Sequence, residues 1–125
     1  MLNPKIALLP TSLCIALLAG PAAAQDPFGN WVRPSTGTQV QFYDCGGKLC
    51  AKIVAVKDES KKGTIGTVIM KGAEKTGPGQ WKGDLLNTED GKTYSGKVTL
   101  DGKGLKLEGC VALVLCKGET WTKIN

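Results

Sequence analysis

The segment that most constrains the fold is residues 80–109, where alternating stretches are separated by two Asp-Gly pairs. In the middle stretch one side carries Tyr94, Gly96, Val98 and Leu100, and the other side carries Thr93, Ser95, Lys97 and Thr99. This period of two is expected for a half-buried strand. Asp90-Gly91 and Asp101-Gly102 flank that stretch, and Asp-Gly favours hairpins because the turn needs residues that tolerate positive φ. The segment therefore predicts an antiparallel meander of three strands.

Turn signals elsewhere in the chain predict further short strands. We expect strands at residues 28–33, 38–43, 49–57, 64–71 and 119–123, with loops at 57–63 and 72–79. About eight short strands at this spacing are typical of an all-β sandwich or barrel. Glycines inside the expected strands, at Gly83, Gly96 and Gly109, mark points where a sheet bends sharply or lets another backbone approach. A closed barrel needs such points, so we expect an eight-stranded antiparallel up-and-down barrel, with a small sandwich as the alternative.

The first 24 residues have the features of a secretory signal peptide. Lys5 supplies a positive charge, residues 6–18 are largely apolar, and Ala22-Ala23-Ala24 offers the small residues that a signal peptidase accepts. A membrane anchor is disfavoured because prolines interrupt an apolar run shorter than the roughly 20 residues of a spanning helix. Cys14 lies in the middle of this run, which disfavours a lipoprotein. We therefore expect cleavage after Ala24 and one β-barrel domain at residues 25–125.

Four cysteines remain in the exported chain: Cys45, Cys50, Cys110 and Cys116. An even set in an exported protein indicates disulfides, and four cysteines allow three connectivities. We predict Cys45 with Cys50 and Cys110 with Cys116, because Gly46-Gly47-Lys48-Leu49 makes a tight reversal that places the first pair side by side. Rings this small stabilise by only about 2 kcal/mol, so geometry rather than energy favours this pairing.

Charge and residue content disfavour several classes of function. The formal charge of +5 falls to +4 without Lys5, and the lysines are dispersed with a single arginine, Arg33. We interpret this as a solvated surface, with no nucleic-acid partner. The chain has no histidine, which removes the commonest general base and zinc ligand. Asp84, Glu89 and Asp90 cluster in sequence but belong to a turn and its flank. We expect no enzyme, no metal site and no cofactor.

The aromatic residues are the better candidates for a ligand site. They are spread over five expected strands, mostly on inward faces, and comprise Trp31, Phe42, Trp81, Tyr94 and Trp121. They could line a cavity, in which case the Tyr94 hydroxyl would orient a ligand. The alternative is that they fill the barrel, since eight strands enclose an interior just wide enough for side chains.

Several motifs together resemble a bacterial family of exported proteins known as domain-of-unknown-function family 2147. They are Gly29-Asn30-Trp31, the Cys45-to-Cys50 segment followed by Lys52-Ile53-Val54, Trp81-Lys82-Gly83, Asp90-Gly91-Lys92-Thr93-Tyr94-Ser95-Gly96, Gly109-Cys110 and Trp121-Thr122-Lys123. The resemblance implies a lipocalin-like or streptavidin-like calyx, a periplasmic or secreted location, and no assigned activity. The chain departs from the family pattern at Ala51, at Asn87-Thr88 and in the short segment 58–68.

Residues 111–115, Val-Ala-Leu-Val-Leu, form an apolar run between two cysteines where a polar turn would be expected. The run could plug one end of the barrel, form a buried strand, or offer an exposed apolar patch to a partner. Two functions follow. The first is binding of a small, partly apolar or aromatic molecule in the cell envelope, with no membrane span in the mature form. The second is a protein-interaction or inhibitor module that uses the 111–115 hairpin.

Overall fold

The computed structural model describes residues 26–112 and 114–125. The expected signal peptide, with Cys14, and Leu113 of the apolar run lie outside the described residues. The described chain contains eight strands and one short 3-10 helix, η2 (Glu59–Thr64). The strands are β1 (Gly29–Val32), β2 (Gln39–Asp44), β3 (Leu49–Ala55), β4 (Val68–Gly77), β5 (Gln80–Asn87), β6 (Lys92–Asp101), β7 (Gly104–Val111) and β8 (Leu115–Lys123).

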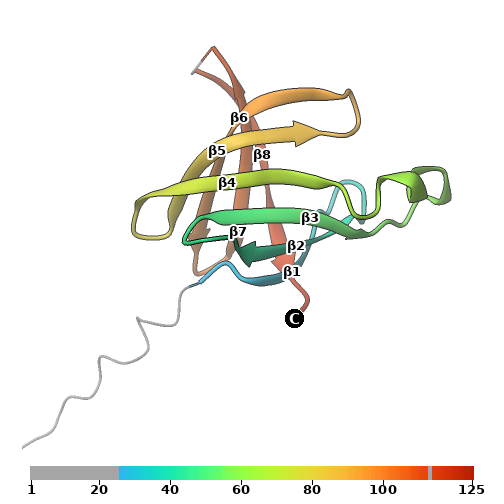
Figure 1. Ribbon diagram of the computed structural model, residues 1–125, viewed down its shortest axis with the longest axis horizontal. Coiled ribbons are helices and arrows are strands. Elements are labelled where there is room, and N and C mark those ends of the chain that lie inside the picture. Colours follow the sequence, from blue (N-terminus) through green and yellow to red (C-terminus); the bar gives the residue numbers. More distant parts are fainter. Residues whose placement is uncertain (1–25, 113) are drawn as a thin grey trace, which may run out of the picture.

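The strands form a closed barrel in which each strand pairs antiparallel with its sequence neighbours. β8 closes the barrel by pairing with β1, with Trp31 opposite Lys123 and Val32 opposite Thr122. The predicted eight-stranded up-and-down barrel is confirmed, and the sandwich alternative is wrong. In Figure 1, β3 and β4 run across the direction of β7 and β8.

The up-and-down order gives the barrel two different ends. The open end carries the connections β1–β2, β3–β4, β5–β6 and β7–β8, and it includes η2 (Figure 1). The closed end carries the tight turns β2–β3, β4–β5 and β6–β7, together with the segment before β1 and the C-terminus. Trp31 is buried, and its indole Nε1 donates a 2.8 Å hydrogen bond to the Pro27 carbonyl. This bond fixes the N-terminal segment against the closed end.

Alternating burial along the strands produces the core. Val40 and Phe42 are buried on β2 between half-buried neighbours, and Leu105 and Leu107 are buried on β7 around the exposed Lys106. The aromatic side chains of Phe42 and Trp121 pack edge to face, with ring centroids 6.0 Å apart. Further buried members of the core are Leu49, Ala51, Ile53, Ile69, Met70, Ala73, Trp81 and Val98.

The limits of the fourth strand differ from the prediction. β4 covers Val68–Gly77, so the expected loop at 72–79 is wrong, and residues 64–67 belong to the end of η2 and a turn. Gly72 reads as a strand breaker in the sequence, but it lies inside β4 with a φ of 133°. The pairing partner of the strand changes here, since Ala73 pairs with β3 whereas Glu74 pairs with β5.

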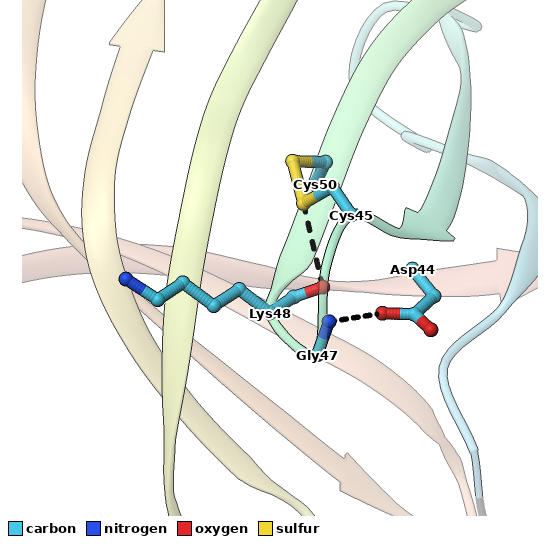
Figure 2. The surroundings of a disulfide bond; sticks show 5 residues. All are labelled: Asp44, Cys45, Gly47, Lys48 and Cys50. Atoms are coloured by element: carbon cyan, nitrogen blue, oxygen red, sulfur yellow. Dashed lines mark hydrogen bonds between the residues drawn. A yellow bond between two sulfur atoms is a disulfide. The ribbon is translucent and has the colours of Figure 1, made fainter.

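Both predicted disulfides are present. Cys45 and Cys50 are bonded across the β2–β3 turn, and Cys110 and Cys116 are bonded between directly opposed positions of β7 and β8. Figure 2 shows the first turn, where the Gly47 amide donates to Asp44 Oδ1 at 2.8 Å. Gly46 and Gly47 have φ values of 77° and 85°, which glycine adopts without strain. The two bonds indicate a folded chain outside the cytoplasm.

The apolar run at the β7–β8 connection is exposed. Val111, Val114 and Leu115 expose 47%, 80% and 65% of their surface. The run is therefore neither a plug nor a buried strand. The run instead lies at the end of the β7–β8 hairpin, which projects beyond the neighbouring strands in Figure 1.

Candidate ligand cavity

A cavity of about 1140 Å³ lies at the open end of the barrel. Its wall is mostly aliphatic and comes from strands all around the barrel: Val40, Ile53, Ile69, Leu85, Leu86, Leu107 and Trp121. Several of these side chains belong to the buried core. The cavity is thus the unfilled continuation of the core, because the interior is packed at the closed end and left open at the other.

A polar rim surrounds the entrance of the cavity. It contains Arg33 at the start of the β1–β2 connection, Asn87 and Glu89 at the β5–β6 connection, and Lys117 and Glu119 on β8. The arrangement of an apolar wall and a polar rim suits an amphipathic molecule, since its apolar part is removed from water while its polar part remains hydrated.

Arg33 and Glu119 form an ion pair across the seam where β8 meets β1. The distance from Arg33 Nε to Glu119 Oε1 is 3.5 Å, and both side chains are about one third exposed. The same carboxylate oxygen accepts hydrogen bonds from the Ser35 amide at 3.2 Å and the Ser35 hydroxyl at 3.0 Å. The Arg33 amide in turn donates to the Thr38 carbonyl at 2.8 Å. These contacts hold the β1–β2 connection against β8. They lie beyond Val32, where β1 ends and its backbone pairing with β8 stops.

Tyr94 and Asp90 form a second polar contact at the rim. The Tyr94 hydroxyl on β6 donates a hydrogen bond to Asp90 Oδ2, and the Lys92 amide donates to Asp90 Oδ1 at 2.9 Å. The Tyr94 hydrogen bond is the largest cause that lowers the pKa of the Asp90 carboxyl below its ordinary value, followed by the bond from Lys92. The same bond raises the pKa of the Tyr94 hydroxyl, because the protonated hydroxyl donates this hydrogen bond to the Asp90 carboxylate.

A smaller hollow of about 270 Å³ adjoins the rim and shares Thr38 and Glu89 with the cavity. Lys61 of η2 donates to Glu89 Oε2 at 2.9 Å, and this bond raises the pKa of the lysine ammonium. The ion pair connects the η2 segment to the β5–β6 connection. The contact is solvent-exposed, so it contributes little to the stability of the fold.

The structure brings together only two of the five aromatic residues proposed for the site. Tyr94 lies at the rim and Trp121 forms part of the inner wall. Trp31, Phe42 and Trp81 are buried and do not line the cavity. Sequence reasoning missed Arg33 and Glu119, although the single arginine of the chain was a signal that could have drawn attention to this position.

Trp121 has a further feature that bears on binding. Its side chain is buried, and its indole Nε1 has no hydrogen-bond acceptor among the described residues. A buried donor without a partner costs about 1–3 kcal/mol. The inner wall of the cavity thus contains a hydrogen-bond donor that the rest of the described barrel does not satisfy.

Among residues 26–112 and 114–125, no group of three or more histidine, cysteine, aspartate or glutamate side chains is placed to hold a metal ion. In that same part of the chain, none of the helices combines the length and apolarity needed to cross a membrane.

A closed eight-stranded antiparallel barrel with one open, cavity-bearing end defines a lipocalin-like calyx. Within that class, the chain belongs to the family of uncharacterized proteins conserved in bacteria known as DUF2147, whose family model matches residues 29–123. The chain is also similar in structure to protein HP1028 from the human pathogen Helicobacter pylori, which is described as belonging to the lipocalin family. That similarity has a TM-score of 0.67 at 22% identity and covers 80% of this chain and 84% of the other. No curated protein shows significant sequence similarity to the chain.

Proposed function

We propose that this protein binds a small, partly apolar molecule in its cavity, outside the cytoplasm, without transforming it chemically. The observation that carries the proposal is the cavity of about 1140 Å³ at the open end of the barrel, with its aliphatic wall. Pockets for small molecules typically measure roughly 300–1,000 Å³ and are lined mainly by apolar side chains. The volume here is sufficient for a molecule of that size together with some water at the entrance.

The distribution of polar groups supports one orientation of the ligand. Ile53, Ile69 and Leu107 favour an apolar chain or ring at depth, since they offer no hydrogen bond. Arg33 and Lys117 supply cationic donors at the rim, where Asn87 and Tyr94 add neutral polar groups. The ligand would therefore insert its apolar part first and keep its polar group at the entrance.

Fluorescence can test the proposal because the three tryptophans occupy different places. Trp121 borders the cavity, whereas Trp31 and Trp81 lie away from it. Titration of the purified protein with a panel of fatty acids, their alcohols and aromatic amphiphiles should change the emission saturably. A Trp121→Phe variant should lose most of that change while a Trp81→Phe variant keeps it.

The proposal fails if no member of the panel changes the emission and calorimetry also detects no binding. Equal signals from Trp121→Phe and Trp81→Phe, combined with saturable binding, would place the ligand elsewhere on the barrel.

The expected location can be tested on its own. Periplasmic extraction of a bacterium expressing the chain should release it with an N-terminus at Gln25 and without free thiols. Recovery in the cytoplasmic fraction with residues 1–24 still attached would contradict the proposed export.

A further inference from the structure

The end of the β7–β8 hairpin is apolar at every position from Cys110 to Cys116. Val111, Val114 and Leu115 are exposed by 47%, 80% and 65%. We call these three residues the apolar tip. Such exposure requires an explanation, because the apolar side chains of a small domain are normally withdrawn from water.

A disulfide joins the two strands at the base of the tip. Cys110 and Cys116 are directly opposed and covalently joined, so the two strands enter the tip at a fixed spacing. Val111 pairs with Leu115 beyond the bond. The strands that carry the tip are therefore held together up to Val111 and Leu115, which limits the conformational entropy that is lost when these residues are covered.

The shape and size of the tip favour a lipid surface over a protein partner. Three aliphatic side chains at the end of a projecting hairpin expose much less surface than the roughly 800 Å² per partner of a stable protein complex. A bilayer imposes no such minimum, since an apolar projection can insert by itself.

The backbone of the tip also suits an apolar environment, where a polar group without a partner is costly. The Val114 amide donates to the Ala112 carbonyl at 2.7 Å, and Val111 and Leu115 are paired as strand neighbours. Ala112 adopts a φ of 52° to make this tight connection. The tip thus satisfies part of its own hydrogen-bonding requirement without water.

A basic residue lies directly behind the tip. Lys117 follows Cys116, is exposed, and takes part in none of the ion pairs found among the described residues. A lysine at this depth would reach anionic lipid headgroups once the apolar residues had entered the bilayer. We propose that the apolar tip docks the barrel on an anionic bilayer surface, with Val114 and Leu115 inserted and Lys117 at the headgroups.

Docking in this way would bring the cavity entrance to the membrane. Val111, Val114, Leu115 and Lys117 all line one side of the cavity as well as forming the hairpin. An apolar ligand could then pass between the bilayer and the cavity along the hairpin without crossing open water. Membrane docking itself does not depend on the presence of a ligand.

Vesicle sedimentation tests the proposal. The purified protein should bind vesicles that contain phosphatidylglycerol. The affinity of the double variant Val114→Ser, Leu115→Ser for these vesicles should be lower by about tenfold or more. The matched control is Ile124→Ser, which changes an apolar residue that is 44% exposed at the opposite end of the barrel. Its binding should equal that of the unchanged protein. Lys117→Gln should weaken binding to these vesicles and leave any binding to pure phosphatidylcholine vesicles unchanged.

A tryptophan reporter tests insertion directly. In Val114→Trp, the emission should shift to the blue with vesicles and be quenched by brominated lipids, whereas Ile124→Trp should show neither effect. The proposal is overturned if the unchanged protein does not bind vesicles, or if the double variant binds as well as Ile124→Ser. It is also overturned if the tip variants abolish self-association or capture by a protein while vesicle binding is absent.

Discussion

Gly83 on β5 lies so close to Ala73 on β4 that a Cβ at position 83 would be 2.7 Å from the Ala73 Cα. Ala73 is fully buried, and the contact occurs where β4 leaves β3 and begins to pair with β5. The barrel turns this corner by packing backbone against backbone. A side chain at position 83 would have to displace main-chain atoms, which cannot move aside as a flexible side chain could.

We therefore expect Gly83→Ala to lower the free energy of unfolding by about 1–3 kcal/mol. Urea denaturation followed by tryptophan fluorescence measures this quantity. Gly109→Ala is the matched control, because its Cβ would be 3.4 Å from the nearest atom, a Tyr94 side-chain carbon, which is an ordinary contact. Equal unfolding free energies for the two variants would show that the backbone near Ala73 can shift to accommodate a Cβ at position 83.

Replacing Cys110 and Cys116 together by alanine should lower the free energy of unfolding by about 2 kcal/mol, since the bond closes a small ring in the unfolded chain. The flanking strands should persist, because β7 and β8 are paired from Leu105 and Trp121 up to the tip. Thermal unfolding of the double variant, compared with the protein under non-reducing conditions, measures the loss. A barrel that no longer folds would mean that the bond determines the β7–β8 register.

Replacing Arg33 by glutamine should weaken the binding of acidic amphiphiles several-fold and leave their neutral esters almost unaffected. The contact with Glu119 uses Nε of the guanidinium, which leaves its two terminal NH₂ groups as donors for an anionic headgroup. Isothermal titration calorimetry of a fatty acid and its methyl ester on both proteins measures the difference. Parallel losses for acid and ester would indicate that Arg33 shapes the entrance rather than recognises charge.

The Tyr94–Asp90 hydrogen bond should make a pH-dependent contribution to stability. The folded-state pKa of Asp90 lies below the ordinary 3.8, so its contribution is present above that value and is lost as the pH falls through the lower, folded-state pKa. The pKa of Tyr94 lies above the ordinary 10.0, so the contribution of Tyr94 is complete below that value and is lost as the pH rises through the higher pKa.

The difference in unfolding free energy between the protein and Tyr94→Phe should therefore be constant between about pH 5 and pH 9 and should shrink at both extremes. An ultraviolet titration gives a second measurement, in which Asp90→Asn should lower the pKa of Tyr94 toward 10.0. An unchanged Tyr94 titration in Asp90→Asn would contradict the assigned hydrogen bond.

Local sequence signals predicted much of the barrel. The Asp90-Gly91 pair lies in the β5–β6 turn, whereas Asp101 ends β6 and pairs with Gly104 across a turn at Gly102 and Lys103. The alternating residues around Val98 face the interior as expected. The cysteine pairing was also predictable, because bonds across short turns depend on geometry within a few residues. These features are local, so the chain specifies them without reference to the rest of the fold.

The prediction was wrong where distant contacts decide the conformation. Gly72 continues β4 instead of ending it, because the strand passes from one partner to the next at this point. The sequence of the run at Val111–Leu115 was equally ambiguous, because an apolar segment can be either buried or exposed. Its exposure depends on how far the hairpin projects beyond the neighbouring strands.

The alternation of strands and turns, the disulfide pairs and the family can all be inferred from the order of residues along the chain. The side chains that face the cavity cannot: Trp31 and Phe42 pack at the closed end, whereas Arg33 and Glu119 meet at the open end. Strand alternation assigns each residue to the inside or the outside of the barrel, but the height of a residue along the barrel axis depends on the register between strands and on the closure of β8 against β1.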